Sequence, residues 1–317
     1  MNQCANQQLW HIGTLVIGSF EFSMNPFTYF SPTTLADAAR VLADHQGQAR
    51  CIAGGTDLLI RMKRHQWLPR AVVNLKRIPG LRDISLNGEL RLGALVTLQG
   101  LVRSAIIREH FPVLAYTASK MAGVQVRNLA TVGGNLCNAS PAADTAPSLI
   151  ALNARAVVVG AQGERTIPLD EFFTGVGKSA LAPDEVLREI IVPRDESVRA
   201  SFTKLEHREA MDISIASVAV SLEVGSWKLE NGKSIPNSQF LIPSDVRIVL
   251  GAVAPTPMRA KQAETILRGN ELTEERIREA ARVAASECKP IDDVRSSAWY
   301  RREMVEVLTR RQLERIK

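Results

Sequence analysis

Short apolar runs alternate with stretches of helical periodicity from residue 24 to the early 190s. Apolar positions over 35–42 repeat at helical spacing behind Thr33 or Thr34, either of which is a good N-cap. The pair Asn87-Gly88 between two alternating runs predicts a tight hairpin turn. Further helices are predicted over 57–66 and 98–121, the latter interrupted at Pro112, and strands over 49–54, 70–78 and 81–97.

The pattern changes after residue 195. Long runs with apolar alternation over 201–209, 213–224 and 245–255 predict strands, with a polar, turn-rich segment over 225–240. Helices are predicted over 273–288 and 297–317. We therefore predict an α+β protein. Its N-terminal domain covers 24–195, with α/β subdomains of about 24–80 and 81–195, and a C-terminal domain over 196–317 has a three-stranded antiparallel sheet and a helical bundle.

Residues 1–23 do not fit a secretory signal, because none of the first ten residues is Lys or Arg. The apolar run over 9–20 is interrupted by His11 and Thr14 and is too short to span a bilayer. Our expectation is that Met24 is the natural start and that 1–23 are an extension. The alternative is an extra strand added to the core.

The composition is that of an ordinary globular chain, with 317 residues, 45% hydrophobic and 23% charged. The net charge is +6, but aromatic residues are only 5% and no lysine-rich run is interleaved with them, which argues against nucleic-acid binding. An anionic ligand or an acidic partner subunit explains the charge equally well.

Four cysteines and five histidines show no CxxC pair and no HExxH spacing. We expect no metal site in this chain. Scattered free cysteines are typical of a reducing compartment, so a cytoplasmic location is expected.

The first candidate for chemistry is the stretch 51–63, CIAGGTDLLIRMK. Gly54 and Gly55 permit positive φ and a close approach of the backbone to a ligand. With Thr56 and Asp57 beside them, successive N–H groups can form a concave nest for an anion, at the start of a helix. An ordinary strand-to-helix turn is the alternative.

A second stretch, TVGGNLCNASPAADTAP over 131–147, repeats the glycine pair at Gly133 and Gly134. Two such loops could hold the two halves of a pyrophosphate. Neither contains GxGxxG or GxxxxGK[ST], which excludes the usual Rossmann and P-loop motifs.

In these residues the sequence resembles the FAD-binding medium subunits of the molybdenum hydroxylases, the family of xanthine dehydrogenase, carbon monoxide dehydrogenase and aldehyde oxidoreductase. The resemblance runs from residue 24 almost to 317. It rests on PFTYFSPTTLADA, AGGTDLLIRMK, TVGGNLCNASPAADTAP, EIIVP and KLEHREAMDISIASVAV, in the family's order and spacing. It implies a two-part FAD-binding domain of the PCMH and vanillyl-alcohol-oxidase type.

The resemblance also implies that the FAD pyrophosphate lies between residues 53–57 and a loop over 131–135. It places Asn138, Ser140 and Asp144 close to the flavin and its ribityl chain. The expected FAD-binding residues are Ile52, Ala53, Gly54, Gly55, Thr56, Asp57, Leu58, Ala130, Thr131, Gly133, Gly134, Asn135, Asn138, Ser140, Asp144, Lys204 and Asp212.

Lys204 and Asp212 would, by the same resemblance, approach the isoalloxazine ring and tune its potential with opposite charges. The alternative for this pair is a surface ion pair. Cys51 and Cys137 are expected to be small core residues. The arginines of the last helix are expected to form a solvated face, with a docking surface as the alternative; they are Arg301, Arg302, Arg310, Arg311 and Arg315.

By resemblance, then, this chain is an electron-transfer flavin subunit with no catalytic residue of its own. A large subunit would hold the molybdopterin centre and the organic substrate, and a small subunit two [2Fe-2S] clusters, as a dimer of heterotrimers. Electrons would leave the FAD to NAD⁺, a quinone, another carrier or dioxygen. The alternatives are a stand-alone flavin oxidoreductase of the same fold, and a binding module that has lost its cofactor.

Overall fold

The computed structural model describes residues 16–17, 20–21, 24–209, 211–224, 227–228, 234–235 and 241–317. The predictions for 1–23 and 225–240 lie outside these residues, apart from two short antiparallel pairs. These pairs are β1 (Val16–Ile17) with β2 (Phe20–Glu21), and β15 (Trp227–Lys228) with β16 (Ser234–Ile235).

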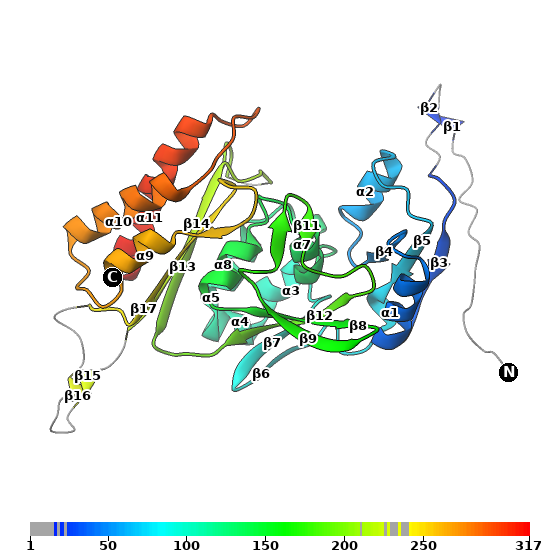
Figure 1. The fold of residues 1–317 in the computed structure, drawn as a ribbon, viewed down its shortest axis with the longest axis horizontal. Helices are drawn as coiled ribbons and strands as arrows, with labels where there is room; N and C mark the ends of the chain where they lie inside the picture. The colour runs from blue at the N-terminus through cyan, green and yellow to red at the C-terminus, as the bar shows by residue number, and fades with distance from the viewer. Residues whose placement is uncertain are drawn as a thin grey trace.

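Three sheet-and-helix units follow one another along the long axis of the molecule (Figure 1). A parallel sheet (blue) lies at one end, a five-stranded sheet with its helices (cyan to green) lies in the middle, and the C-terminal sheet and helices (yellow to red) lie at the other end. This agrees with the predicted α+β class. The domain boundaries 24–195 and 196–317 remain proposals.

The parallel sheet has the strand order β3-β5-β4, and helices connect its strands as parallel pairing requires. The hydroxyl of Thr34 accepts a hydrogen bond from the Asp37 N–H at 3.1 Å, which confirms Thr34 as an N-cap. The elements are β3 (Thr28–Phe30), α1 (Leu35–Asp44), β4 (Ala49–Ile52), α2 (Leu58–Lys63), β5 (Ala71–Asn74) and the 3₁₀ turn η1 (Leu75–Arg77).

The central sheet is antiparallel with the order β6-β7-β12-β8-β9. Gly88 has φ +75° between β6 and β7, so the predicted Asn87-Gly88 turn is confirmed. Its strands are β6 (Ile84–Asn87), β7 (Glu89–Gly93), β8 (Arg155–Gly160), β9 (Gly163–Pro168) and β12 (Val186–Pro193), with a hairpin of β10 (Phe173–Gly175) and β11 (Lys178–Ser179) alongside.

The helical stretch predicted over 98–121 is confirmed together with its interruption at Pro112, which begins α5. A second break was not predicted: Ser104 has extended backbone dihedrals, and its hydroxyl caps the next helix. The helices of this unit are α3 (Leu98–Arg103), α4 (Ala105–His110), α5 (Pro112–Ser119), α6 (Val124–Arg127), α7 (Val132–Asn138) and α8 (Thr145–Ala151).

The C-terminal sheet is antiparallel in the order β13-β14-β17-β18. The three predicted long strands are confirmed, and a two-residue edge strand and a third helix, α9, add to the prediction. The elements are β13 (Val198–Leu205), β14 (Ala216–Glu223), β17 (Asp245–Gly251), β18 (Met258–Arg259), α9 (Lys261–Leu267), α10 (Glu274–Glu287) and α11 (Ala298–Ile316).

This sheet is buried on both faces. Alternate residues of β14 and β17, such as Val218 and Ile248, pack against the three C-terminal helices, which lie on the outer side of the sheet (Figure 1). Residues pointing the other way, Ala219 and Val249, belong to the core of the central unit. The sheet therefore joins the two units through a continuous apolar core.

Small side chains let α8 lie directly on the inner face of this sheet. A Cβ on Gly251 would come within 2.4 Å of the Ser217 hydroxyl oxygen and 2.8 Å of Pro147 in α8. The Ser221 hydroxyl donates to the Ala151 carbonyl at 2.6 Å. Larger residues at these positions would push α8 away from the sheet.

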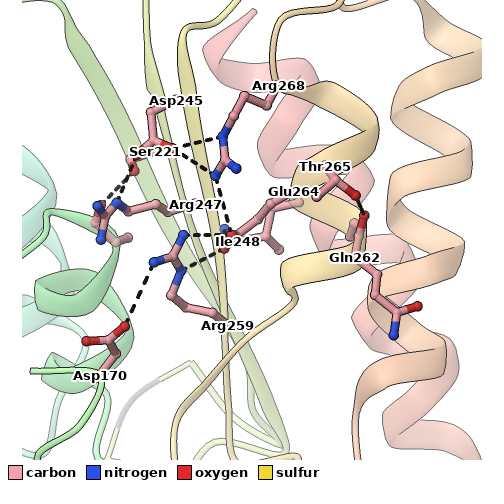
Figure 2. Close-up of polar contacts among 12 residues, drawn as sticks. Asp170, Ser221, Asp245, Arg247, Ile248, Arg259, Gln262, Glu264, Thr265 and Arg268 are labelled. Carbon is pink, nitrogen blue, oxygen red and sulfur yellow. Dashed lines mark hydrogen bonds and ion pairs between the residues drawn. The ribbon is translucent and has the colours of Figure 1, made fainter.

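A buried carboxylate, Glu264, anchors α9 to the edge of the sheet (Figure 2). Glu264 is 1% exposed and accepts from the Ile248 N–H at 3.0 Å. The Arg259 guanidinium binds both of its oxygens, at 3.0 and 2.7 Å. Arg259 also lies 3.8 Å from Asp170 of the central unit, so one arginine connects the two units.

Glu264→Gln is expected to lower the free energy of unfolding by about 3 kcal/mol, because Arg259 then keeps its charge in a half-buried position without its partner. Denaturant unfolding measures this change. Glu274→Gln, which breaks the exposed pair with Arg278, is the matched control and should be close to neutral. Equal destabilisation by the two variants would contradict the assignment of Glu264 as an anchor.

Candidate functional site

The first glycine stretch forms the turn between β4 and α2. A Cβ on Gly54 would lie 2.1 Å from the Leu129 carbonyl oxygen, so only glycine lets the backbone at 129–130 approach this closely. Gly55 has φ +77°, a conformation that favours glycine. Close packing at Gly54 and the positive φ of Gly55 therefore each explain why glycine occupies the position. The sequence pattern alone did not reveal these two causes.

Four consecutive backbone N–H groups in this turn have no acceptor. Among the residues that the structure describes, the N–H groups of Gly54, Gly55, Thr56 and Asp57 donate to no carbonyl or side chain. Unpaired N–H groups are expected at the start of a helix such as α2. Four of them in succession at a glycine turn can also receive an acceptor from outside the chain, as a backbone nest does.

The second glycine stretch is a helix start, so the prediction of a loop over 131–135 is wrong. Thr131 is the N-cap of α7, and its hydroxyl accepts from the Gly134 N–H at 3.0 Å. The Gly133 N–H donates to Ala94 O at 3.0 Å, and the Val132 N–H to Val96 O at 2.9 Å. The N–H groups of Val132, Gly133, Gly134 and Asn135 are thus paired within the chain, unlike those of residues 54–57.

Close packing explains Gly133, whose added Cβ would lie 2.6 Å from the Ala94 carbonyl oxygen. Gly134 is different. A Cβ there would meet only the Thr131 hydroxyl at 2.9 Å and the Ala53 methyl at 3.9 Å. Gly134 therefore keeps the space between the two stretches open.

A cleft of about 660 Å³ lies between the two stretches, which is in the usual range for a ligand pocket. Asn138 at the end of α7 closes it: its Nδ2 donates to Asp57 Oδ1 at 3.2 Å, and its Oδ1 is buried with no partner among the described residues. The predicted residues that line the cleft are Ala53, Gly54, Gly55, Thr56, Asp57, Leu58, Ala130, Thr131, Gly133, Gly134, Asn135 and Asn138.

The other five predicted residues do not line the cleft. Ile52 ends β4 directly before it, and Ser140 accepts from the Ala142 N–H at 3.3 Å in the turn after α7. Asp144, Lys204 and Asp212 form a separate cluster. The cleft also has lining residues that sequence reasoning missed, namely Arg50, Trp67 and Lys178.

Trp67 is held by two arginines, with the Arg61 guanidinium 4.3 Å and that of Arg50 5.5 Å from the ring centroid. Nothing in the sequence distinguishes Trp67 from an ordinary surface residue. Of these three missed residues, only Arg50 could have been proposed from the sequence, because it lies in the predicted strand directly before the first glycine stretch.

The cluster around Lys204 is buried. The Lys204 side chain is 2% exposed, and its ammonium lies 3.3 Å from Asp144 and 2.8 Å from Glu206. It also donates to the backbone carbonyl of Asp212 at 3.1 Å. The alternative of a surface ion pair between Lys204 and Asp212 is therefore wrong: the partners are buried carboxylates, and Asp212 contributes its carbonyl.

The two aspartates differ in environment. Burial raises the pKa of Asp144, and the nearby Lys204 ammonium and the Ser214 hydroxyl, which donates to it, oppose that rise. The Asp212 carboxylate is exposed and accepts from the N–H groups of Ile213 and His207, which hold its pKa below the usual range. Asp212 is thus an ionised loop anchor.

A direct contact links this cluster to the cleft. The Thr145 hydroxyl, one residue beyond Asp144, donates to Asn135 Oδ1 at 2.5 Å. Asn135 lines the cleft in α7. Asp144 is the N-cap of α8, so the helix that starts at this cluster contacts the helix that lines the cleft.

Cys51 and Cys137 line the cleft and are only partly buried, so the expectation that they are core residues holds in part. Burial raises the pKa of each thiol to about 12. Within the described part of the chain, no group of three or more His, Cys, Asp or Glu side chains could hold a metal ion. No helix there is long and apolar enough to cross a membrane.

Comparison with known proteins places both halves of the chain in one family. The family described as the FAD binding domain in molybdopterin dehydrogenase matches residues 22–195. The CO dehydrogenase flavoprotein C-terminal domain matches residues 200–316.

Full-length relatives agree. The xanthine dehydrogenase FAD-binding subunit of Escherichia coli O157:H7 is 33% identical over 288 residues, covering 90% of this chain and 94% of the relative. The carbon monoxide dehydrogenase medium chain of Hydrogenophaga pseudoflava is 32% identical over 289 residues, covering 90% and 96%.

Solved structures share the fold. Carbon monoxide dehydrogenase from H. pseudoflava, lacking the Mo-pyranopterin moiety, matches with a TM-score of 0.84 at 32% identity over 92% of this chain and 96% of that one. Quinoline 2-oxidoreductase from Pseudomonas putida 86 matches with a TM-score of 0.81 at 26% identity over 93% and 98%. This chain therefore belongs to the family of FAD-binding flavoprotein subunits of the molybdopterin dehydrogenases.

Proposed function

We propose that this chain is the FAD-carrying electron-transfer subunit of a heteromeric molybdopterin-containing hydroxylase or dehydrogenase. It would pass electrons from [2Fe-2S] clusters of a partner subunit through FAD to an external acceptor. The observation that carries the proposal is the cleft with four unpartnered N–H groups, in a chain of this family.

The residues present fit an FAD pyrophosphate. The free N–H groups of residues 54–57 supply neutral donors to a dianion, and the amides of α7 are already satisfied within the chain. The unpartnered Asn138 Oδ1 is an acceptor for a hydroxyl or N–H of the ligand. In this proposal the pyrophosphate binds mainly to the first glycine stretch. Because Gly134 has no side chain, it leaves room for the pyrophosphate between the two stretches.

Bound FAD supplies the two-electron chemistry, and the chain would tune it. In this proposal Ile52 supports the turn at the end of β4, and the flavin and its ribityl chain would lie near Ser140, Asp144, Lys204 and Asp212. A buried ammonium favours added negative charge nearby, and the two carboxylates beside Lys204 weaken that effect. Lys204 would therefore raise the flavin potential by less than an unpaired ammonium would.

The proposed partners are a large molybdopterin subunit and a small subunit with two [2Fe-2S] clusters, as a dimer of heterotrimers in the cytoplasm. Relatives described as medium chains or FAD-binding subunits support this division of labour. The organic substrate would bind on the large subunit. NAD⁺, a quinone, another carrier or dioxygen would accept the electrons.

A stand-alone flavin oxidoreductase is the second candidate, since the cleft alone would suit it. Purification of the natural complex separates the two candidates. Iron and molybdenum that co-purify with the chain in fixed ratio support the subunit, and a chain that purifies alone with FAD and oxidises an organic substrate contradicts it.

The first prediction concerns the nest. Gly55→Ala should weaken FAD binding at least about tenfold, because the altered turn loses hydrogen bonds to a charged group. Gly88→Ala is the matched control, since Gly88 has φ +75° with nothing within 4 Å of an added Cβ and carries the same backbone strain. Both are measured by fluorescence titration of the apoprotein. Equal FAD affinity in the two variants would contradict the nest.

The second prediction concerns Asn138. Asn138→Ala removes the unpartnered Oδ1 and leaves Asp57 without the amide that it binds. FAD affinity should fall by about tenfold, because a hydrogen bond is lost and a carboxylate faces the cleft unshielded. Adding Asp57→Asn should recover part of the loss. No recovery in the double variant would show that Asp57 lies away from the ligand.

The third prediction concerns redox tuning. Lys204→Met should lower the flavin midpoint potential by about 30 mV, the equivalent of about 1.4 kcal/mol for a two-electron couple. Lys204→Arg, which keeps the charge, should stay closer to the unaltered protein, and Asp212→Asn should raise the potential. Spectroelectrochemical titration is the measurement. Unchanged potentials in Lys204→Met and Asp212→Asn would place both residues away from the ring.

A further inference from the structure

Arg301 is buried, so its predicted place on a solvated helix face is wrong. It is 3% exposed in the first turn of α11, whereas Arg302, Arg311 and Arg315 of the same helix are exposed. Burial of an arginine is costly unless its donors are satisfied. The groups that accept hydrogen bonds from the buried Arg301 guanidinium therefore need to be identified.

The Arg301 guanidinium holds three separate chain segments. One nitrogen, Nη1, donates to Ile215 O at 2.7 Å and to Ala252 O at 2.8 Å. The other, Nη2, binds Asp293 Oδ1 at 2.7 Å. Only a forked, permanently charged donor can join two carbonyls and a carboxylate in this way.

The first contact leads to the Lys204 cluster within one residue. Ile215 follows Ser214, whose hydroxyl donates to Asp144 Oδ1. The Ile215 N–H donates to Leu205 O at 2.8 Å, directly beside Lys204. Fixing the Ile215 carbonyl therefore fixes the start of β14 against the end of β13, where Ser214 and Lys204 lie.

The third contact leads to the same cluster from the other side. Asp293 also accepts from the Arg295 N–H at 2.8 Å, which orders the segment before α11. The Arg295 carbonyl lies 2.8 Å from His207 Nε2. The His207 N–H donates to the Asp212 carboxylate at 3.0 Å, and the Asp212 carbonyl accepts from Lys204 at 3.1 Å.

Two chains of contacts, which we call arms, begin at Arg301: one runs through Ile215 and the other through Asp293. Both end at the ammonium of Lys204 and its partner Asp144. We propose that Arg301 is a positioning residue that sets the place of the Lys204–Asp144 cluster, and through it the electrostatics of the flavin site. This inference rests on the proposed function for its second half. Its first half, the ordering of residues 205–209 and 211–215, does not require FAD.

Hydrogen exchange tests the first half in the apoprotein of the full chain. Arg301→Met should speed exchange of the His207, Ile213 and Ile215 amides at least tenfold over the unaltered protein. The matched control is Arg259→Met, an arginine of the same domain that binds Glu264 and touches neither arm. It should leave these three amides unchanged while lowering the unfolding temperature. Exchange that is equal in the two variants overturns the proposal.

The flavin midpoint potential tests the second half in the FAD-loaded chain. Arg301→Met should shift it in the same direction as Lys204→Met, and Arg301→Met in the Lys204→Met background should add no further shift, because the two residues act through one cluster. Arg301→Lys should recover part of the shift. Faster exchange with an unchanged potential overturns the positioning role, whereas absence of FAD binding in the unaltered chain contradicts the proposed function alone.

Asp293→Asn is the second variant if Arg301→Met does not fold. It removes the negative charge that pairs with Arg301 and weakens the acceptor of the Arg295 N–H, whereas the hydrogen bonds of Arg301 to Ile215 and Ala252 remain. Exchange of the His207 and Ile213 amides should therefore speed up by a larger factor than exchange of the Ile215 amide. Equal change at all three amides, or at none, contradicts the two-armed arrangement.

Discussion

The close packing of α8 on the inner face of the C-terminal sheet sets the geometry of everything around the site. Gly251 and Ser221 leave room for the helix, and the Ser221 hydroxyl fastens its last turn. Asp144 lies at the start of this helix, and Lys204 lies on β13, which pairs with β14. Their 3.3 Å separation is thus a result of how closely a helix of the central unit and the C-terminal sheet can approach.

Much of the architecture follows from short-range signals that the sequence carries openly. The Thr34 cap, the Asn87-Gly88 turn and the apolar alternation of the three long C-terminal strands all depend on residues close to one another in the chain. The family resemblance rested on five motifs, each of them a short run of neighbouring residues, in the family's order and spacing. These features were predictable because their physical causes lie within a few residues.

Long-range contacts could not be predicted in the same way. Gly54 and Gly133 looked like ligand-facing residues, yet the backbone carbonyls of Leu129 and Ala94 explain both. Arg301 looked like a solvated residue because two of its three acceptors, Ile215 and Ala252, come from distant segments. Lys204 has Asp144 within reach only after α8 and β13 meet. Side chains whose partners are distant in sequence carry no local pattern.

The two thiols in the cleft have a chemical consequence. With a pKa of about 12, the thiols of Cys51 and Cys137 are protonated at neutral pH. Oxidants such as peroxide attack the thiolate and not the thiol. The burial that makes these sulfurs part of the cleft wall therefore also makes them slow to oxidise.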